Sequence, residues 1–257
     1  MNKEFSVALV GASGVVGTKI IKLLEKRLFP VGKFIPLGNS TVGSSIEFNN
    51  KKYLIESLEN FDPKTAQIII FSAGSTVAEK YARDFVAAGS FVVDLSSNFR
   101  YQDDVPLIIP EINGDIIESL SKPSLIANPN CSTAQLLMAL KPIHDNAKIK
   151  FLNIATYQAV SGTGKAALEE LHNQTYFTDS ENESVVYPKQ IAFNVIPQCD
   201  IFLENNFTKE EMKLTWETHK ILDSSIRIQA TCVRVPVYNG HSEAVFFKVS
   251  KDMSREE

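Results

Sequence analysis

The sequence predicts an α/β protein in which helices cover both faces of a parallel sheet, followed by a second region of α+β character. The first observation behind this prediction is an alternation of apolar, β-branched runs at 5–10, 34–37, 67–71 and 91–95 with helical patterns at 15–28 and 77–88. The second is a glycine-rich turn between the first run and the first helix. Such alternation is typical of βαβ units.

Shorter elements complete the prediction. Residues 46–55 are expected to form two strands around a turn at Asn49 and Asn50. The pattern changes after residue 131, which predicts a boundary between a domain at 1–131 and one at 132–257. In the second domain we expect helices at 132–143, 164–174 and 208–222 and strands at 150–158, 226–237 and 242–249.

Local signals mark three of these later segments. The helix at 208–222 opens with Thr208 and has Glu211 three residues on, which is a capping box. The last two strands flank Tyr238-Asn239-Gly240, which predicts a β-hairpin. Residues 177–200 are mostly polar and have no clear period.

The composition excludes several classes of function. The 257 residues include 26 Lys and Arg against 30 Asp and Glu, a net charge of −4, so the basic face of a nucleic-acid-binding protein is not expected. The sequence contains no run of 18 apolar residues, so a membrane span is not expected. The N-terminus lacks the pattern of a signal peptide. Three scattered cysteines are too few for a disulfide framework or a Cys-x-x-Cys metal site. We therefore expect a cytoplasmic protein without nucleic-acid or membrane partners.

The turn after the first strand predicts a nucleotide site. It reads Gly11-Ala12-Ser13-Gly14-Val15-Val16-Gly17; glycines there let the backbone approach a pyrophosphate at a helix N-terminus. The alternative is a glycine-rich turn without a ligand. An NAD site would place an acid after the second strand, where this chain has Asn39-Ser40-Thr41. The missing acid favours NADP, although no arginine stands there for a 2′-phosphate.

Cys131 is the strongest candidate for a catalytic residue. It follows the turn Asn128-Pro129-Asn130 and opens a helical pattern, and a helix N-terminus favours the thiolate form of a cysteine. The alternative is a small buried cysteine, which is the interpretation adopted for Cys199 and Cys232.

A thiolate mechanism needs a group that transfers protons. His241 follows the predicted hairpin turn and could reach a cleft or stay in solvent. The other histidines, His144, His172 and His219, fall in helical patterns among polar residues and are expected at the surface.

Several other polar residues are candidates for a binding role, but each can also be explained without one. Arg100 lies in a loop where α/β sheets bind ligands, and Arg234 is an isolated charge within an apolar strand or on its solvent face. For Lys213 the sequence itself gives only weak evidence of a functional role. Gln158 and the pair Ser161-Gly162 end a strand and begin a turn, which ordinary turn chemistry explains as well.

Together these segments resemble the aspartate-semialdehyde dehydrogenase family. The resemblance runs from Val7 to about Val249 through GASGVVG, FSAGST, DLSSNFR, NPNCSTAQ, TYQAVSGTGK, EEMKLTWETHK and RVPVYNGH. NPNCST followed by Gln158, Arg234 and His241 is highly specific. N-acetylglutamyl-phosphate reductases usually read NPGCY at the cysteine, and glyceraldehyde-3-phosphate dehydrogenases have a different context again.

The resemblance implies a phosphorylating, NADP-dependent enzyme that interconverts aspartate semialdehyde and aspartyl phosphate in lysine, threonine and methionine biosynthesis. It implies a Rossmann-like NADP-binding domain, a substrate-binding and dimerisation domain, and a homodimer. Cys131 would form an acyl thioester and His241 would act as general acid and base. The implied substrate and phosphate contacts are Gln158, Arg234, Arg100, Lys213 and Asn130. The implied cofactor contacts are Gly11, Ser13, Gly14, Val15, Val16, Ser40, Thr41, Ser161 and Gly162.

Two departures from the family pattern affect these expectations. The family's Ser-Arg-Ser-Ala-Gly stretch appears here as Asn39-Ser40-Thr41-Val42-Gly43, without its arginine. Family members also continue for several dozen residues beyond Glu257, so we expect a C-terminally truncated chain that is unstable or inactive as it stands. Two alternatives stay open: an enzyme for a different acyl phosphate, and a non-catalytic homologue, which the presence of both Cys131 and His241 disfavours.

Overall fold

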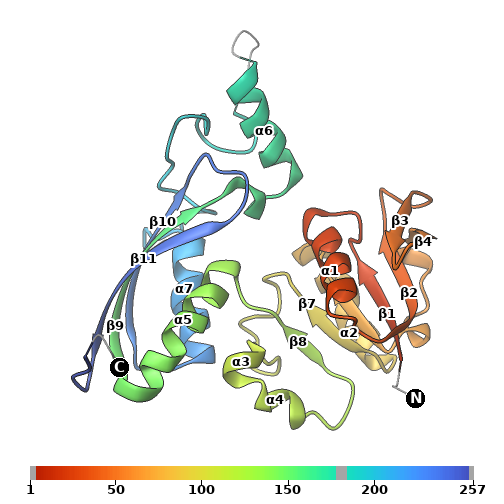
Figure 1. The fold of residues 1–257 in the computed structure, drawn as a ribbon, viewed down its shortest axis with the longest axis horizontal. Coiled ribbons are helices and arrows are strands. Elements are labelled where there is room, and N and C mark those ends of the chain that lie inside the picture. Colours follow the sequence, from red (N-terminus) through yellow and green to blue (C-terminus); the bar gives the residue numbers. More distant parts are fainter. Residues whose placement is uncertain (1–3, 178–183, 255–257) are drawn as a thin grey trace. The chain divides into compact units, whose positions relative to one another are not determined.

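The computed structural model describes residues 4–177 and 184–254. The chain divides into two compact units, Met1–Pro129 and Asn130–Glu257, and each is described by itself (Figure 1). The placement of functional domains at 1–131 and 132–257 stays a prediction. In the part of the chain that the structure describes, no helix has the length and apolar character needed to cross a bilayer.

The first unit is built on a parallel sheet with the strand order β5-β2-β1-β6-β7-β8. Its strands are β1 (Phe5–Val10), β2 (Val31–Gly38), β5 (Glu56–Ser57), β6 (Ile68–Phe71), β7 (Phe91–Asp94) and β8 (Leu125–Ala127). The long helices are α1 (Val15–Lys26) and α2 (Ser75–Ala87). The predicted α/β architecture is confirmed.

The centre of this sheet explains the apolar run at the start of the chain. Four successive residues of β1, Val7 to Val10, are completely buried, as expected for a parallel strand covered on both faces. The chain passes from β1 to β2 on one side and later to β6 on the other. Ligands bind at such a reversal of strand order, at the carboxyl ends of the strands.

The smaller elements of the first unit lie around this sheet. The predicted pair of short strands is confirmed as β3 (Ser45–Phe48) and β4 (Lys51–Leu54), with Asn49 and Asn50 in the left-handed region at the turn. The short helices are η1 (Leu58–Asn60), η2 (Pro63–Thr65), α3 (Pro110–Asn113) and α4 (Asp115–Glu118).

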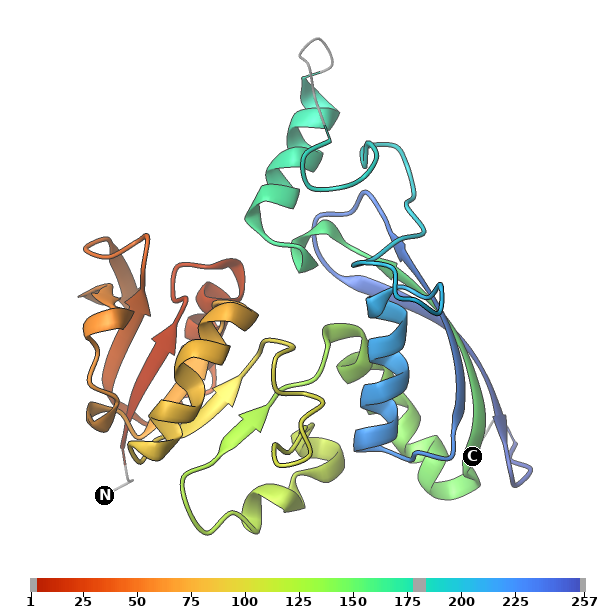
Figure 2. The same cartoon turned by 180° about the vertical axis from the view of Figure 1, so that it is seen from behind.

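The second unit packs two long helices on one face of a three-stranded sheet (Figure 2). The helices are α5 (Cys131–Ala147) and α7 (Lys209–Ile221), and the strands are β9 (Ile149–Gln158), β10 (Arg227–Arg234) and β11 (His241–Val249). The core between them contains Leu136, Leu140, Leu152, Ile154 and Leu214. Beyond one end of the sheet lie η3 (Val160–Gly162) and α6 (Lys165–Tyr176).

The predicted hairpin between the last two strands is wrong. β9 lies between β10 and β11, and pairs in parallel with β10 and antiparallel with β11. The reason is the connection, in which Val160 N donates to Val237 O and Ser161 N donates to Tyr238 O. These bonds carry the chain past the end of β9 instead of folding it back on β10.

The sheet of the second unit leaves its other face open. Along β9 and β11 alternate side chains point away from the helices, and the apolar ones include Tyr157, which is 44% exposed, and Phe246, which is 59% exposed. One half of each strand's pattern therefore belongs to the core, and the other half forms an uncovered, partly apolar surface.

Candidate active site

Cys131 is the first residue of α5, and its side chain is exposed. The N-cap is Asn130, whose Oδ1 accepts hydrogen bonds from Ser132 N at 2.9 Å and Thr133 N at 3.3 Å. Asparagine is a favoured N-cap because its side chain satisfies these first helical N–H groups. The thiol thus stands at the positive end of a helix, where a thiolate is favoured.

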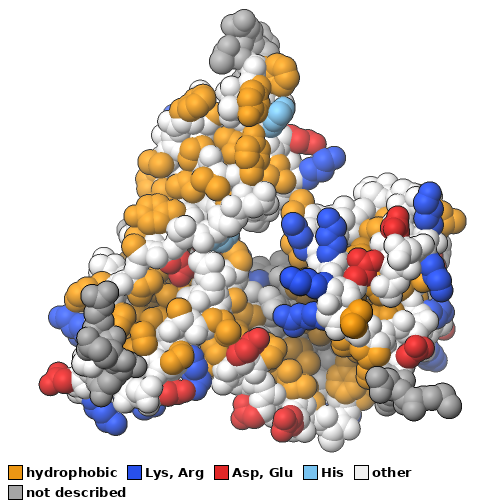
Figure 3. All heavy atoms as spheres, in the orientation of Figure 1, with side chains coloured by type: hydrophobic (Ala, Val, Ile, Leu, Met, Phe, Trp, Pro, Cys, Tyr) orange, Lys and Arg blue, Asp and Glu red, His pale blue; other side chains and the backbone are white. Residues whose placement is uncertain are grey.

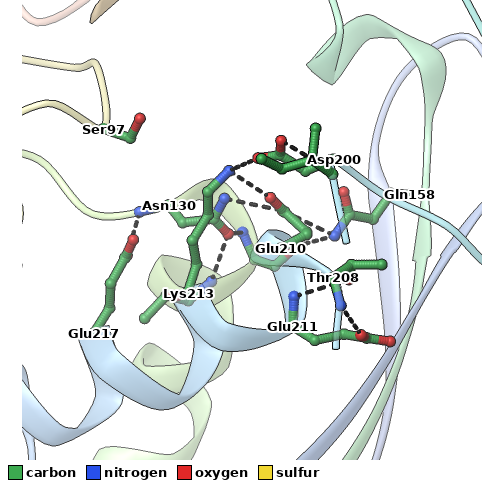
Figure 4. Close-up of polar contacts among 12 residues, drawn as sticks. Ser97, Asn130, Gln158, Asp200, Thr208, Glu210, Glu211, Lys213 and Glu217 are labelled. Carbon is green, nitrogen blue, oxygen red and sulfur yellow. Dashed lines mark hydrogen bonds and ion pairs between the residues drawn. The ribbon is translucent and has the colours of Figure 1, made fainter. Parts of the chain in front are cut away.

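The Asn130 residue is also held from α7 (Figure 4). Its backbone N donates to Glu217 Oε2 at 2.6 Å, and its Nδ2 donates to Glu210 Oε1 at 3.0 Å. Its own carbonyl accepts from Ala134 N. Every polar group of Asn130 therefore has a partner, and the turn that presents Cys131 is fixed from two sides.

The buried carboxylate of Glu210 belongs to a cluster of three charged residues. Lys213 Nζ lies 2.9 Å from Glu210 Oε2 and 2.7 Å from Asp200 Oδ2. Burial alone would lower the pKa of Lys213, but the charge of Glu210 and the bonds to both carboxylates raise it above its ordinary value. Burial would likewise raise the pKa of Glu210, yet Lys213 keeps it below the ordinary value. Both groups are charged at neutral pH.

Three sequence-predicted residues share one row of the sheet. Gln158 on β9 is paired with Arg234 on β10 and with His241 on β11, so their side chains leave the same face of the sheet. Gln158 Nε2 donates to Ser132 Oγ at 3.2 Å and to Glu210 Oε1 at 3.1 Å. Gln158 therefore links this row to the residue that follows Cys131.

The neighbouring turn supplies the space beside this row. A Cβ on Gly162 would lie 3.4 Å from Nε2 of His241 and 3.5 Å from Nη1 of Arg234. Arg234 Nη1 donates to Ala159 O at 2.7 Å, whereas its buried Nε has no hydrogen-bond partner among the described residues. A planar guanidinium with an unused donor is suited to a carboxylate ligand.

The ring of His241 is oriented by the backbone. Ala159 N donates to its Nδ1 at 3.0 Å, so the neutral ring carries its proton on Nε2. Burial lowers the pKa of His241, and the positive charge of Arg234 adds to this effect. At neutral pH His241 therefore offers an N–H donor beside Gly162.

The first unit contains the predicted nucleotide turn. A pocket of about 380 Å³ lies at the carboxyl ends of β1, β2 and β6, and its lining includes Gly11, Ser13, Gly14, Asn39, Ser40, Thr41, Ser72 and Ala73. Gly11 has φ +80°, and a Cβ on Gly17 would collide with the carbonyl oxygen of Gly11. No side chain caps the N-terminus of α1, so its N–H groups suit a phosphate.

The predicted site residues thus fall into two groups. Asn130, Cys131, Gln158, Ser161, Gly162, Lys213, Arg234 and His241 lie in the second unit. Arg100 lies in the first unit, where it is buried and donates to Asn128 O at 2.9 Å and Leu95 O at 3.1 Å. Val15 and Val16 begin α1 but do not line the pocket.

One prediction about the histidines is wrong. His144 is 4% exposed rather than at the surface, because its helix packs that side toward Asp223, whose Oδ2 lies 3.5 Å from Nε2. His172 is exposed, and His219 is half-buried with Nε2 2.7 Å from Ile226 O. Cys199 and Cys232 are buried, as predicted, and burial raises the pKa of the Cys199 thiol to about 11.

Sequence reasoning missed two of the acidic residues of α7, Glu210 and Glu217. Glu210 and Glu217 lie four residues before and three after the buried Leu214, so they share its face of the helix. An acid at an apolar position of an amphipathic helix is the signal that could have found them.

Glu243 is another missed residue. It stands two positions after His241 on the same face of β11 and accepts from Gln135 Nε2 at 2.7 Å. Gln135 lies one turn after Cys131 on α5. Burial raises the pKa of Glu243 from its ordinary 4.5 to about 7.

Comparisons with known proteins agree with this geometry. Two family models match, the semialdehyde dehydrogenase NAD-binding domain at residues 6–120 and the semialdehyde dehydrogenase dimerisation domain at 140–257. The aspartate-semialdehyde dehydrogenase of Shewanella violacea is 49% identical, with 100% of this chain and 77% of the relative covered. Aspartate-semialdehyde dehydrogenase 2 of Vibrio cholerae is 44% identical with the same coverage.

A solved structure is similar over nearly the whole chain. Aspartate semialdehyde dehydrogenase II of Vibrio cholerae, crystallised in complex with ASA, superposes with a TM-score of 0.96 at 43% identity. The match covers 99% of this chain and 77% of that one.

Proposed function

The chain belongs to the aspartate-semialdehyde dehydrogenase family, and on this premise we propose that its reaction proceeds through a thioester on Cys131. The family members are oxidoreductases of amino-acid biosynthesis that act on an aldehyde. The observation that carries the proposal is the fixed turn at the N-terminus of α5, which presents Cys131 next to the Gln158 row.

The chemistry at Cys131 balances in the direction of aldehyde oxidation. Its thiolate adds to the aldehyde carbon, and a C–S bond forms while the carbonyl oxygen becomes an alkoxide. A nicotinamide cofactor, when bound, would supply the two-electron acceptor for the aldehyde hydrogen, which leaves as hydride. The thioester left on Cys131 is then attacked by an oxygen of inorganic phosphate, which releases the acyl phosphate and regenerates the thiolate.

His241 serves the oxygen of the reacting carbon. In the tautomer fixed by Ala159, its Nε2–H donates to the developing alkoxide. In the biosynthetic direction the same donor supports the oxygen while the C–S bond breaks to give the aldehyde. In this tautomer Nε2 acts as a hydrogen-bond donor, and the general acid and base role that the family resemblance implies for His241 stays a prediction.

Charge complementarity supports the substrate assignment. Aspartate semialdehyde carries an α-carboxylate and an α-ammonium. Arg234, with its unused buried Nε, is proposed to bind the carboxylate, and the buried carboxylate of Glu210 to face the ammonium. Gln158 and Asn130 orient the reacting end, and Lys213 and Arg100 are proposed to bind phosphate.

For the cofactor we propose NADP, bound in the pocket of the first unit. The N–H groups at the start of α1 and the close backbone of Gly11 and Gly14 fit the pyrophosphate. None of the residues described as lining this pocket is acidic, so nothing there repels a 2′-phosphate. Ser161 and Gly162 are proposed as further cofactor contacts.

For assembly we propose a homodimer formed through the open face of the second unit's sheet. The family model that covers residues 140–257 is a dimerisation domain, and this face exposes Tyr157 and Phe246. The other proposed partners are the small-molecule substrate and inorganic phosphate. The absence of a disulfide pattern in the sequence supports a cytoplasmic location.

A transient experiment tests the thioester. The protein used is the chain extended to the full length of its relatives, of which it spans 77%. Aspartate semialdehyde and NADP are mixed with this protein in the absence of phosphate, and NADPH is followed by fluorescence. We expect a burst no larger than the enzyme concentration, which continues into steady turnover only when phosphate is added. Intact-mass spectrometry of the arrested enzyme should show the acyl group on Cys131, and steady turnover without phosphate would contradict the proposal.

A further inference from the structure

The end of the cofactor pocket that follows β2 is built from uncharged residues. Gly38, Asn39, Ser40 and Thr41 line it. In dinucleotide-binding sheets, an acid at this position binds the ribose 2′-hydroxyl of NAD, whereas an arginine receives the 2′-phosphate of NADP. Among the residues described as lining the pocket, none carries a charge of either sign.

The segment after β2 has a defined conformation. Thr41 O accepts from Ser44 N at 3.1 Å and from Ser44 Oγ at 2.6 Å, and Gly43 N donates to Ile55 O at 2.9 Å. The hydroxyl of Thr41 lies 3.1 Å from Ser13 Oγ in the glycine-rich turn. The backbone of Thr41 is therefore fixed within its own turn by Ser44, and its side chain is held against the glycine-rich turn by Ser13.

Close packing keeps this hydroxyl over the end of β2. A Cβ on Gly38 would lie only 2.8 Å from Thr41 Oγ1. Ser40 and Asn39 are exposed beside it. The groups offered to the adenosine ribose are thus hydroxyls and an amide, each of which can accept from a hydroxyl or donate to a phosphate oxygen.

The Lys and Arg residues that the structure describes in the first unit do not line this pocket. Figure 3 shows Lys and Arg side chains gathered over α1, where Lys19, Lys22 and Lys26 are exposed. None of the three lines the pocket. A 2′-phosphate bound there would gain hydrogen bonds but no buried ion pair.

We propose that Asn39 and Thr41 give this chain a neutral adenosine-ribose site that binds NAD and NADP with affinities within about tenfold of each other, because neither discriminating charge is present. The proposal rests on the proposed function only in taking the pocket of the first unit as the dinucleotide site. NADP remains a cofactor, and NAD becomes a second one.

Binding measurements on the full chain test this proposal without turnover. Dissociation constants for NADPH and NADH are measured by ligand fluorescence, and those for 2′,5′-ADP and 5′-AMP by calorimetry, which isolates the adenosine end. In Thr41→Arg, we expect the preference for NADPH over NADH, and for 2′,5′-ADP over 5′-AMP, to rise at least about tenfold, because a guanidinium pairs only with the 2′-phosphate. In Asn39→Asp, we expect the opposite preference, since a carboxylate repels the 2′-phosphate and accepts from the ribose hydroxyl.

Val42→Arg is the matched control. Val42 is the next residue, is 50% exposed and does not line the pocket, so the same charge there should leave the NADPH to NADH ratio within about threefold of the wild type. Thermal unfolding midpoints near the wild-type value show that each variant folds.

The outcomes separate the two proposals. A wild-type preference for NADPH or for NADH above about tenfold, or equal effects of Thr41→Arg and Val42→Arg on the NADPH to NADH ratio, would overturn the neutral-site inference while leaving the proposed function intact. Failure of every dinucleotide and nucleotide to bind the wild-type chain would overturn both, since the pocket would then not be the cofactor site.

Discussion

Asn130 shows how single polar atoms position the nucleophile. Its Oδ1 caps α5, its Nδ2 bonds to Glu210, and its backbone N bonds to the fully buried Glu217. A buried hydrogen bond left unmade costs about 1–3 kcal/mol, so the turn before Cys131 has little freedom to shift. The helix N-terminus at which Cys131 stands favours the thiolate form.

Replacement of the nucleophile tests its role directly. In Cys131→Ser, we expect steady-state turnover to fall by roughly three orders of magnitude or more, since a serine hydroxyl is almost fully protonated at neutral pH and a much weaker nucleophile. The dissociation constant for NADP should change little, because Cys131 is not among the proposed cofactor contacts. Turnover within about tenfold of the wild type would exclude the thioester route.

Arg234 gives a second prediction at this scale. Its fork is anchored on Ala159 O through Nη1 while Nε stays unused, and an ammonium cannot reproduce such a two-point contact. In Arg234→Lys, we expect KM for aspartate semialdehyde to rise by about 10- to 100-fold, as for the loss of a charge-assisted hydrogen bond. An unchanged KM, with only kcat reduced, would remove the carboxylate assignment.

At the scale of elements, local patterns predicted most helices and strands because those segments have clear periods and caps. The capping box at Thr208 and Glu211 is present in α7, and the buried run of β1 is central. The sequence did not predict β8, α3 and α4, because a segment of three or four residues is too short to show a hydrophobic period. The strand order β10-β9-β11 was not predicted, because it depends on hydrogen bonds between residues 160–161 and residues 237–238, which lie far apart in the sequence.

The same distinction applies to the candidate site. Cys131, Gln158, Arg234 and His241 lie in motifs that identify them, but nothing local shows that Gln158 joins the other two in one row. Glu210 and Glu217 act through packing of α7 on the nucleophile turn. Helix–helix contacts of this kind depend on the tertiary fold. From the sequence alone, an acidic residue on a helix is therefore interpreted as solvent-exposed, because the buried face of the helix is not yet known.

The burial of Glu243, the residue on β11 that accepts from Gln135 of α5, predicts a pH dependence of stability. Glu243 has its pKa raised by burial from 4.5 to about 7. Between these values the unfolded chain is ionised there while the folded chain stays protonated, so the free energy of unfolding falls as pH rises through that window and then levels off. The size of the effect is on the order of 1–3 kcal/mol, given the partial exposure of the group.

Urea unfolding of the wild type and of Glu243→Gln at pH 5 and pH 8 measures this linkage. The amide keeps a hydrogen-bonding oxygen for Gln135 and does not titrate, so the stability of Glu243→Gln relative to the wild type should rise from pH 5 to pH 8. A constant difference between the two proteins across this range would show that Glu243 titrates normally.

At the scale of the whole molecule, the two sheets differ in how many of their faces are covered by helices. In the first unit the central strand β1 is buried on both faces, whereas in the second unit α5 and α7 cover only one face of the sheet. An uncovered sheet face with aromatic side chains is typical of a protein interface. A twofold dimer would set this face against the same face of a second copy.

Phe246→Glu tests that assembly at the centre of the open face. A carboxylate on each copy would be brought against its symmetry mate without a partner, which costs several kcal/mol in a buried contact. We expect the dimer to dissociate at micromolar concentration in analytical ultracentrifugation, with circular dichroism unchanged because Phe246 is 59% exposed within its own unit. Val185→Glu provides the control, since Val185 is 84% exposed and lies off the sheet. Dissociation by Val185→Glu but not by Phe246→Glu would move the interface from the sheet to the segment after α6.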